Sequence, residues 1–356
     1  MEAQEILIDI NFVLLYGGVI MLSVVAALYL LLRRGNAIAP EVSSPVRLRR
    51  WAGAFLMVCA LSHVFWLFYA YHPTPTIYLI VCDLDLLLLF PTIAGVLLSM
   101  LQDRRRHVWP VLVALVPVFV LSVLSVIRGD DVLYAPMAIY SIALYAFMML
   151  YMYFAVRNYG RWLRDNYADL ENKEVWQSFL ILAVFLLFFV MYSSTSIGNS
   201  VLVYLLQIDC IVIVGLLLWR VETLQQLNES SSLEVSAAPT TTSSKISALL
   251  QKHCESMQLY LQNDLTLSQL ANAIGTNRTY LSQHFAQQGI TYNTYINALR
   301  IRHFIRLYQE AVAEHRIFTA QQLAFESGYH SYSSFSAAFK QYTGKTVTAW
   351  THNAGQ

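Results

Sequence analysis

Long apolar runs fill most of the first 220 positions, and shorter segments in which apolar and polar residues alternate follow after position 245. An α-helix needs about 20 apolar residues to cross ~30 Å of hydrocarbon. Seven runs approach or exceed that length: Asn11–Leu32, Trp51–Tyr71, Ile77–Leu101, Val108–Ile127, Val132–Val156, Trp176–Ile197 and Val201–Trp219. The pattern predicts an all-α chain with a seven-helix transmembrane bundle over residues 1–220.

The composition agrees with a membrane protein. Of the 356 residues, 57% are hydrophobic and 13% are charged, whereas soluble domains carry about 25% charged residues. These values exclude a disordered chain. The four cysteines show no paired spacing, which argues against a disulfide-stapled secreted domain.

The charge of the connecting loops predicts how the chain is oriented. Lys and Arg close to membrane spans resist translocation. The first, third and fifth loops between the predicted spans hold twelve Lys and Arg, while the N-terminal segment and the even-numbered loops hold only Arg128. We therefore expect a multi-pass protein of the cytoplasmic membrane, with its N-terminus outside and its C-terminus in the cytoplasm.

Four ionisable residues, His63, Asp83, Asp85 and Asp209, lie inside predicted spans, where each costs about 2.5–3.5 kcal/mol to insert. Asp83 is about 200° around the helix from Asp85 and cannot share a pocket with it, which leaves His63, Asp85 and Asp209. Counted at 1.5 Å per residue, all three lie about 12 Å below the outer surface. We expect them to form an outward-facing sensing site that binds a proton, a cation or a small amine. The alternative is a static polar clasp that holds spans two, three and seven together.

The membrane half offers no catalytic motif. No lysine lies inside a predicted span, which excludes a retinal-type Schiff base. The chain also contains neither an HExxH pair nor a GxSxG motif. We therefore expect no enzymatic activity, no cofactor and no metal site.

Residues 221–245 form the predicted linker between the membrane domain and the tail. Their central part, from Asn228 to Ser244, reads NESSSLEVSAAPTTTSS and has no sustained hydrophobic period. A Ser/Thr/Ala-rich stretch of this kind behaves as a flexible tether.

The tail contains an approximate internal repeat, because QLANAIG at 269–275 recurs as QLAFESG at 322–328. Each copy follows a threonine, Thr266 or Thr319, at the spacing of a capping box with its glutamine. Gly275 and Gly328 suit the positive φ of a tight turn, and a second amphipathic segment follows each. The repeat predicts two helix-turn-helix units. Nine Lys and Arg against five Asp and Glu in residues 245–356 favour a polyanionic partner, double-stranded DNA.

At this level of detail the tail resembles the DNA-binding domain of the AraC/XylS family of bacterial transcription regulators. The resemblance rests on TLSQLANAIGTNRTYLSQHF, on YINALRIRHFIRLY and on QQLAFESGYHSYSSFSAAFKQYTGKT. It implies an all-helical domain over residues 246–356, in which a long helix joins two units and two recognition helices enter successive major grooves. The tail departs from the family pattern at Val347, usually proline, and at Phe304, usually a small residue.

The resemblance also implies which residues contact DNA. Bases would be read by Thr279, Ser282, Gln283, Tyr332, Ser333 and Ser336, and phosphates would be bound by Arg278, Lys340 and Lys345. Gln283 has the donor and acceptor needed to pair bidentately with adenine. Arg300 matches a family arginine that is either an internal ion-pair partner or a phosphate contact.

Together these features predict a one-component transcription regulator of the bacterial inner membrane. Its seven-helix domain would sense a small ligand, an ion or a proton, and its tail would bind promoter DNA sequence-specifically. Further expected partners are membrane lipids, a second copy of the chain in a homodimer and, for an activator, RNA polymerase. The alternative function is a transporter-like membrane protein whose cytoplasmic tail reports substrate occupancy.

Overall fold

The computed structural model describes residues 9–33, 35–40, 42–128, 132–170, 173–177, 179–180, 200–227 and 243–354. Over these residues the regular elements are all helices, and the β-type pairing is one isolated antiparallel bridge between Tyr167 and Thr266. The predicted all-α fold is confirmed. The chain divides into two compact units, Met1–Tyr159 with Val175–Leu227 and Gly160–Glu174 with Asn228–Gln356.

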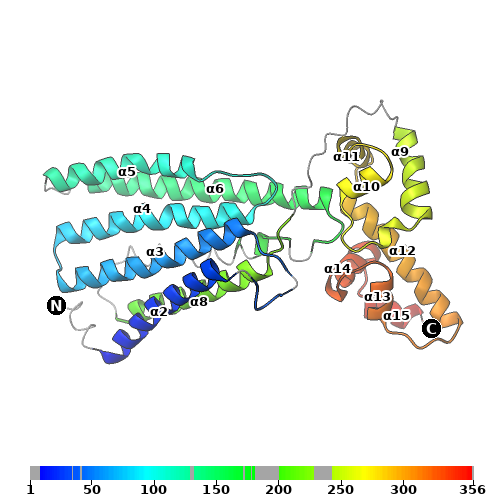
Figure 1. The fold of residues 1–356 in the computed structure, drawn as a ribbon, viewed down its shortest axis with the longest axis horizontal. Coiled ribbons are helices and arrows are strands. Elements are labelled where there is room, and N and C mark those ends of the chain that lie inside the picture. The colour runs from blue at the N-terminus through cyan, green and yellow to red at the C-terminus, as the bar shows by residue number, and fades with distance from the viewer. Residues whose placement is uncertain are drawn as a thin grey trace. The chain divides into compact units, whose positions relative to one another are not determined.

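The first unit is a bundle of long apolar helices (Figure 1). Its helices are α2 (Ile10–Leu32), α3 (Val46–Tyr71), α4 (Pro75–Met100), α5 (Trp109–Arg128), α6 (Tyr134–Asn166) and α8 (Ser200–Thr223). All six are long and apolar enough to cross a membrane. They correspond to six of the seven predicted spans, and the predicted span Trp176–Ile197 lies largely outside the described residues.

Close helix packing in this unit depends on small residues. Helix α3 packs against α2 and α4, and α8 packs against α2 and α3. A Cβ atom on Gly95 of α4 would lie 2.3 Å from the Trp51 ring of α3, so only glycine fits this contact. The outer faces expose large apolar side chains such as Leu14, Ile139 and Phe147, as a lipid-facing surface requires.

A buried polar cluster ties the end of α8 to the loop between α2 and α3. The carboxylate of Glu222 accepts hydrogen bonds from the backbone N–H groups of Ala37 (3.0 Å) and Ile38 (2.7 Å). Asn36 donates from Nδ2 to the Glu222 carbonyl at 2.9 Å and accepts from Arg49 Nη1 at 2.8 Å. This cluster holds the last helix at the point where the linker begins.

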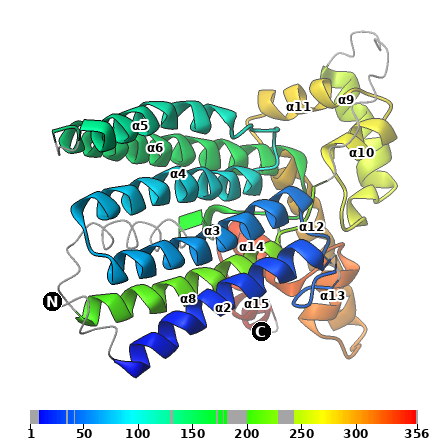
Figure 2. The same ribbon diagram turned by 60° about the vertical axis from the view of Figure 1, so that its left-hand side comes forward.

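The second unit consists of shorter helices arranged around α12 (Figure 2). Its elements are α9 (Ser243–Leu249), the π-helical turn η1 (Leu250–Ser256), the 3-10 turn η2 (Leu259–Leu261), α10 (Leu267–Ala273), α11 (Arg278–Gln287), α12 (Tyr292–Ala313), α13 (Ala320–Glu326), α14 (Tyr332–Thr343) and α15 (Val347–Ala354). Residues 228–242 of the predicted linker lie outside the described residues.

Two hydrophobic cores lie along α12, one for each half of the tail. The first contains Leu270, Leu281 and Phe285 with the N-terminal part of α12. The second is built around Phe304, whose ring centroid lies 4.5 Å from that of Phe335. Phe304 and Val347, two of the positions that depart from the family pattern, are buried in this second core. Phe304 therefore fills the space between α12 and α14.

Residues 160–174, the loop that follows the fifth predicted span, group with the tail. Ala168 in this loop is buried in the first tail core. The loop lies within residues 1–220, the predicted membrane domain, and its contacts group it with the second unit.

Candidate nucleic-acid interface

Side-chain caps begin both helices of the first helix-turn-helix unit. Thr266 accepts a hydrogen bond at Oγ1 from the Gln269 N–H (3.2 Å), and Gln269 Oε1 accepts from the Thr266 N–H (2.8 Å), which completes the predicted capping box. Gly275 has φ +70°. Asn277 then caps α11, because its Oδ1 accepts from the Thr279 N–H at 2.6 Å.

The second helix-turn-helix unit repeats this design with one difference. Thr319 Oγ1 accepts from the Gln322 N–H at 3.1 Å, but the Gln322 side chain donates to Glu326 Oε1 at 3.0 Å. The predicted capping box is therefore only half formed, because Gln322 finds an acceptor one turn along its own helix. Gly328 has φ +87°, and Ser331 caps α14.

Both second helices bury one face and expose the other. Leu281 and Phe285 of α11 and Phe335 and Phe339 of α14 are at most 2% exposed. The residues predicted to contact bases lie on the other side. Four of them are exposed, namely Thr279, Gln283, Tyr332 and Ser333, and the other two, Ser282 and Ser336, are half-buried. A recognition helix needs such a polar outward face at its N-terminal end.

The predicted phosphate contacts lie at the edges of these helices. Arg278 opens α11, Lys340 lies in the last turn of α14, and Lys345 follows α14; all three are exposed. Cations at such positions fix the register of a protein on DNA without reading sequence. Their roles, like those of the base-contacting residues, stay predictions.

Arg300 is an internal residue. It is fully buried, and its guanidinium donates from Nε to the Tyr260 carbonyl (2.8 Å) and from Nη2 to the Gln262 carbonyl (2.7 Å). It also lies 5.4 Å from the centre of the Tyr329 ring. Of the two roles left open by the sequence, this burial rules out phosphate binding. The principal partners are carbonyl oxygens of the η2 segment.

Two histidines of the tail are buried. His284 of α11 is 3% exposed and His303 of α12 is 8% exposed. Burial lowers the pKa of both imidazoles, and the nearby Arg306 lowers the pKa of His303 further. Both rings therefore favour the neutral form at pH 7.

The three candidate sensing residues lie on three helices of the first unit. His63 Nε2 on α3 lies 3.2 Å from Gln207 Oε1 on α8, and Asp85 Oδ2 on α4 accepts from Trp66 Nε1 at 2.6 Å. Asp209 on α8 is 4% exposed, and neither of its carboxylate oxygens has a hydrogen-bond partner among the described residues. The first two contacts join neighbouring helices, as the clasp alternative requires, and the sensing site stays a prediction.

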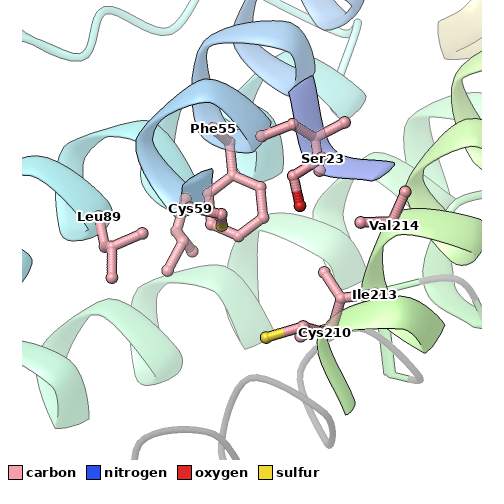
Figure 3. A pocket seen from close by; sticks show the side chains of 9 residues that line it. Ser23, Phe55, Cys59, Leu89, Cys210, Ile213 and Val214 are labelled. Atoms are coloured by element: carbon pink, nitrogen blue, oxygen red, sulfur yellow. The ribbon is translucent and has the colours of Figure 1, made fainter. Parts of the chain in front are cut away.

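Figure 3 shows an apolar cavity between the helices of the first unit. Phe55, Cys59, Leu89 and Cys210 line it, together with Ser23 and neighbouring aliphatic residues, and its volume is about 20 Å³. That volume suits about one water molecule, whereas small-molecule sites have about 300 Å³ or more. The cavity is a packing defect and too small for an organic ligand.

The sequence did not reveal a further set of contacts at the recognition helices. Arg278 Nε donates to Asn166 Oδ1 at 3.0 Å, and Ser334 Oγ on α14 donates to Asp169 Oδ1 at 3.0 Å. Asn166 is the last residue of α6, and Asp169 belongs to the loop that follows it. No local pattern signals these pairs, because their partners lie more than a hundred positions apart in the chain.

Comparisons with known proteins agree with the geometry of the second unit. A family model described as a helix-turn-helix domain matches residues 270–353. An uncharacterized HTH-type transcriptional regulator of Staphylococcus aureus strain MRSA252 is 31% identical over 94 residues, which are 26% of this chain and 12% of that protein. Similar regulators of strains COL and MSSA476 are 30% identical with the same coverage. No solved structure matches.

These matches identify one part of the chain. The region shared with the staphylococcal regulators covers only 12% of their own length. The family match lies wholly within the second unit and runs from Leu270 in α10 to residue 353 in α15. Residues 270–353 are therefore a helix-turn-helix domain of the AraC type.

Proposed function

We propose that this protein is a membrane-integrated, one-component transcription regulator. The observation that carries the proposal is the presence, in one chain, of two capped recognition helices with polar outward faces and of six helices apolar enough to cross a membrane. The role of such a chain is regulatory rather than catalytic. Its place is the bacterial inner membrane, with the helix-turn-helix domain in the cytoplasm.

The contacts of residues 160–174 support this topology. Asn293 of α12 donates from Nδ2 to the Ala168 carbonyl at 2.6 Å, so the loop and the tail lie on the same side of the membrane. The chain must then cross the membrane an even number of times between them, as the two predicted spans Trp176–Ile197 and Val201–Trp219 provide. Twelve Lys and Arg in the odd-numbered loops favour the cytoplasm for that side.

On DNA, α11 and α14 would enter successive major grooves. Gln283 and the hydroxyl-bearing residues of both helices would read base edges, and Arg278, Lys340 and Lys345 would bind phosphates. The signal would enter through the helix bundle, with His63, Asp85 and Asp209 as the candidate sensing groups. A stimulus changes DNA binding only if it binds two states of the helix bundle with different affinities.

DNA binding by the full-length protein in lipid nanodiscs tests this function. A random DNA pool should yield a preferred sequence, and the logarithm of the affinity should fall linearly with the logarithm of the salt concentration. Lys340→Ala should weaken binding to all sequences and reduce the salt slope by about one. Lys252→Ala is the matched control, because this exposed lysine lies in η1, outside both helix-turn-helix units. Absence of binding even at low salt would refute the proposal.

A further inference from the structure

Residues 166–170 and Lys173, which lie in the connection between two predicted spans, are all buried or half-buried. Asn166, Ala168, Asp169 and Lys173 are each at most 9% exposed. Loops normally run over the surface, because their backbone polar groups need partners. Here the partners come from the helix-turn-helix domain.

The first half of the tail anchors the loop. Asn293, at the start of α12, donates from Nδ2 to the carbonyls of Ala168 (2.6 Å) and Tyr167 (3.3 Å). Tyr167 also forms the antiparallel bridge with Thr266, the N-cap of α10. The loop backbone is thus paired with the first helix-turn-helix unit, and Ala168 contributes to its core.

The loop then contacts both recognition helices at their N-terminal turns. Asn166 accepts from Arg278, the first residue of α11, and Asp169 accepts from Ser334, the third residue of α14. Recognition helices contact DNA through this end. An anion is also favoured at a helix N-terminus, where free N–H groups and the helix dipole attract it. The carboxylate of Asp169 is therefore an anion at the start of α14, where a DNA phosphate would also be favoured.

We infer that the DNA-facing surface of the tail is also a docking surface for the chain's own loop 160–174, and that the docked loop and DNA exclude each other. The inference rests on the proposed DNA-binding function. Arg278 cannot give the same Nε–H to Asn166 and to a phosphate, and Asp169 would repel a phosphate that approaches α14. DNA binding therefore requires release of the loop.

Chain connectivity gives this docking a regulatory consequence. Helix α6 runs without interruption from Tyr134 to Asn166, so the residue that binds Arg278 is the last residue of the fifth apolar helix. A shift or rotation of α6 would displace Asn166 and the loop after it. The bundle can thus control DNA binding by holding or withdrawing the loop.

The test compares two variants of the full-length protein in nanodiscs. Asp169→Ala and Asp165→Ala each remove one negative charge from the same loop, but Asp165 is exposed and no described residue of the helix-turn-helix units bonds to it. Without the hydrogen bond to Ser334, Asp169→Ala should bind DNA about tenfold more tightly than the unaltered protein. Asp165→Ala should stay within about twofold. Equal effects of the two variants would show a general charge effect and overturn the inference.

Hydrogen exchange of the unaltered protein provides a second measurement that needs no variant. Amides of residues 166–170 should be protected without DNA and should exchange faster in the DNA complex. Unchanged protection in the complex would mean that loop and DNA bind together, which overturns the inference while leaving the proposed function intact. If neither the unaltered protein nor either variant binds DNA, the proposed function is overturned, and with it the inference that the docked loop and DNA exclude each other.

Discussion

At the scale of single residues, buried polar side chains add hydrogen bonds between segments that pack in the hydrophobic cores. Arg300 is the clearest case, since it links α12 to the carbonyls of Tyr260 and Gln262 and lies against the Tyr329 ring. Burial lowers the pKa of this guanidinium, yet the group remains charged at any physiological pH. Its Nε and Nη2 donors are held by backbone acceptors, so its contribution is to the fold and not to DNA.

Replacing this arginine should therefore destabilise the tail. Arg300→Met removes the donors from buried carbonyls, each costing about 1–3 kcal/mol when left without a partner. We expect a loss of about 3 kcal/mol in the opening free energy of α12, measured by amide exchange in the full-length protein. Arg302→Met, on the exposed side of the same helix, should change it by less than about 0.5 kcal/mol. Similar losses in both variants would contradict the structural role of Arg300.

At the scale of elements, each helix-turn-helix unit depends on its turn glycine, but the two glycines differ in their surroundings. Gly275 (φ +70°) has open space where a Cβ would lie. At Gly328 (φ +87°) a Cβ would lie 2.7 Å from the Leu261 carbonyl oxygen. Gly328 thus also permits the η2 segment to lie close to the second helix-turn-helix unit.

This difference predicts unequal costs for the same substitution. Gly275→Ala should cost about 1–2 kcal/mol, the strain of a left-handed alanine. Gly328→Ala should cost about 1–3 kcal/mol more, because the backbone of Leu261 must move. Exchange of amides in α10 and α13 measures both effects in the full-length protein. Equal losses of opening free energy in the two variants would show that the contact with Leu261 does not contribute to the cost of replacing Gly328.

The helix-turn-helix units show how far a local pattern leads. The threonine caps at Thr266 and Thr319 and the positive-φ turns at Gly275 and Gly328 were predicted from spacing, and the structure confirms them. The reciprocal bond of the second capping box was wrong, because Gln322 has a competing acceptor in Glu326. A pattern identifies the donors and acceptors that are available, and the packing around them selects which ones pair.

At the scale of the whole molecule, the proposed mechanism depends on which side of the membrane the tail occupies. A reporter enzyme that folds only in the cytoplasm, fused after Gln356, should be active. The same reporter fused within the loop between α3 and α4 should be inactive, because that loop is predicted to be extracytoplasmic. The reverse result would place the helix-turn-helix domain away from the chromosome and exclude gene regulation by this chain.

The sequence by itself determined the features that depend on near neighbours. Span length, the loop charges, the helix caps and the turn glycines involve residues a few positions apart, so six apolar helices and both helix-turn-helix units could be predicted. Only the tertiary structure decided which distant residues meet. It placed Arg300 among carbonyls, His63 beside Gln207 and Asp169 at the start of α14. Such contacts follow from how helices pack, and no spacing along a single chain specifies them.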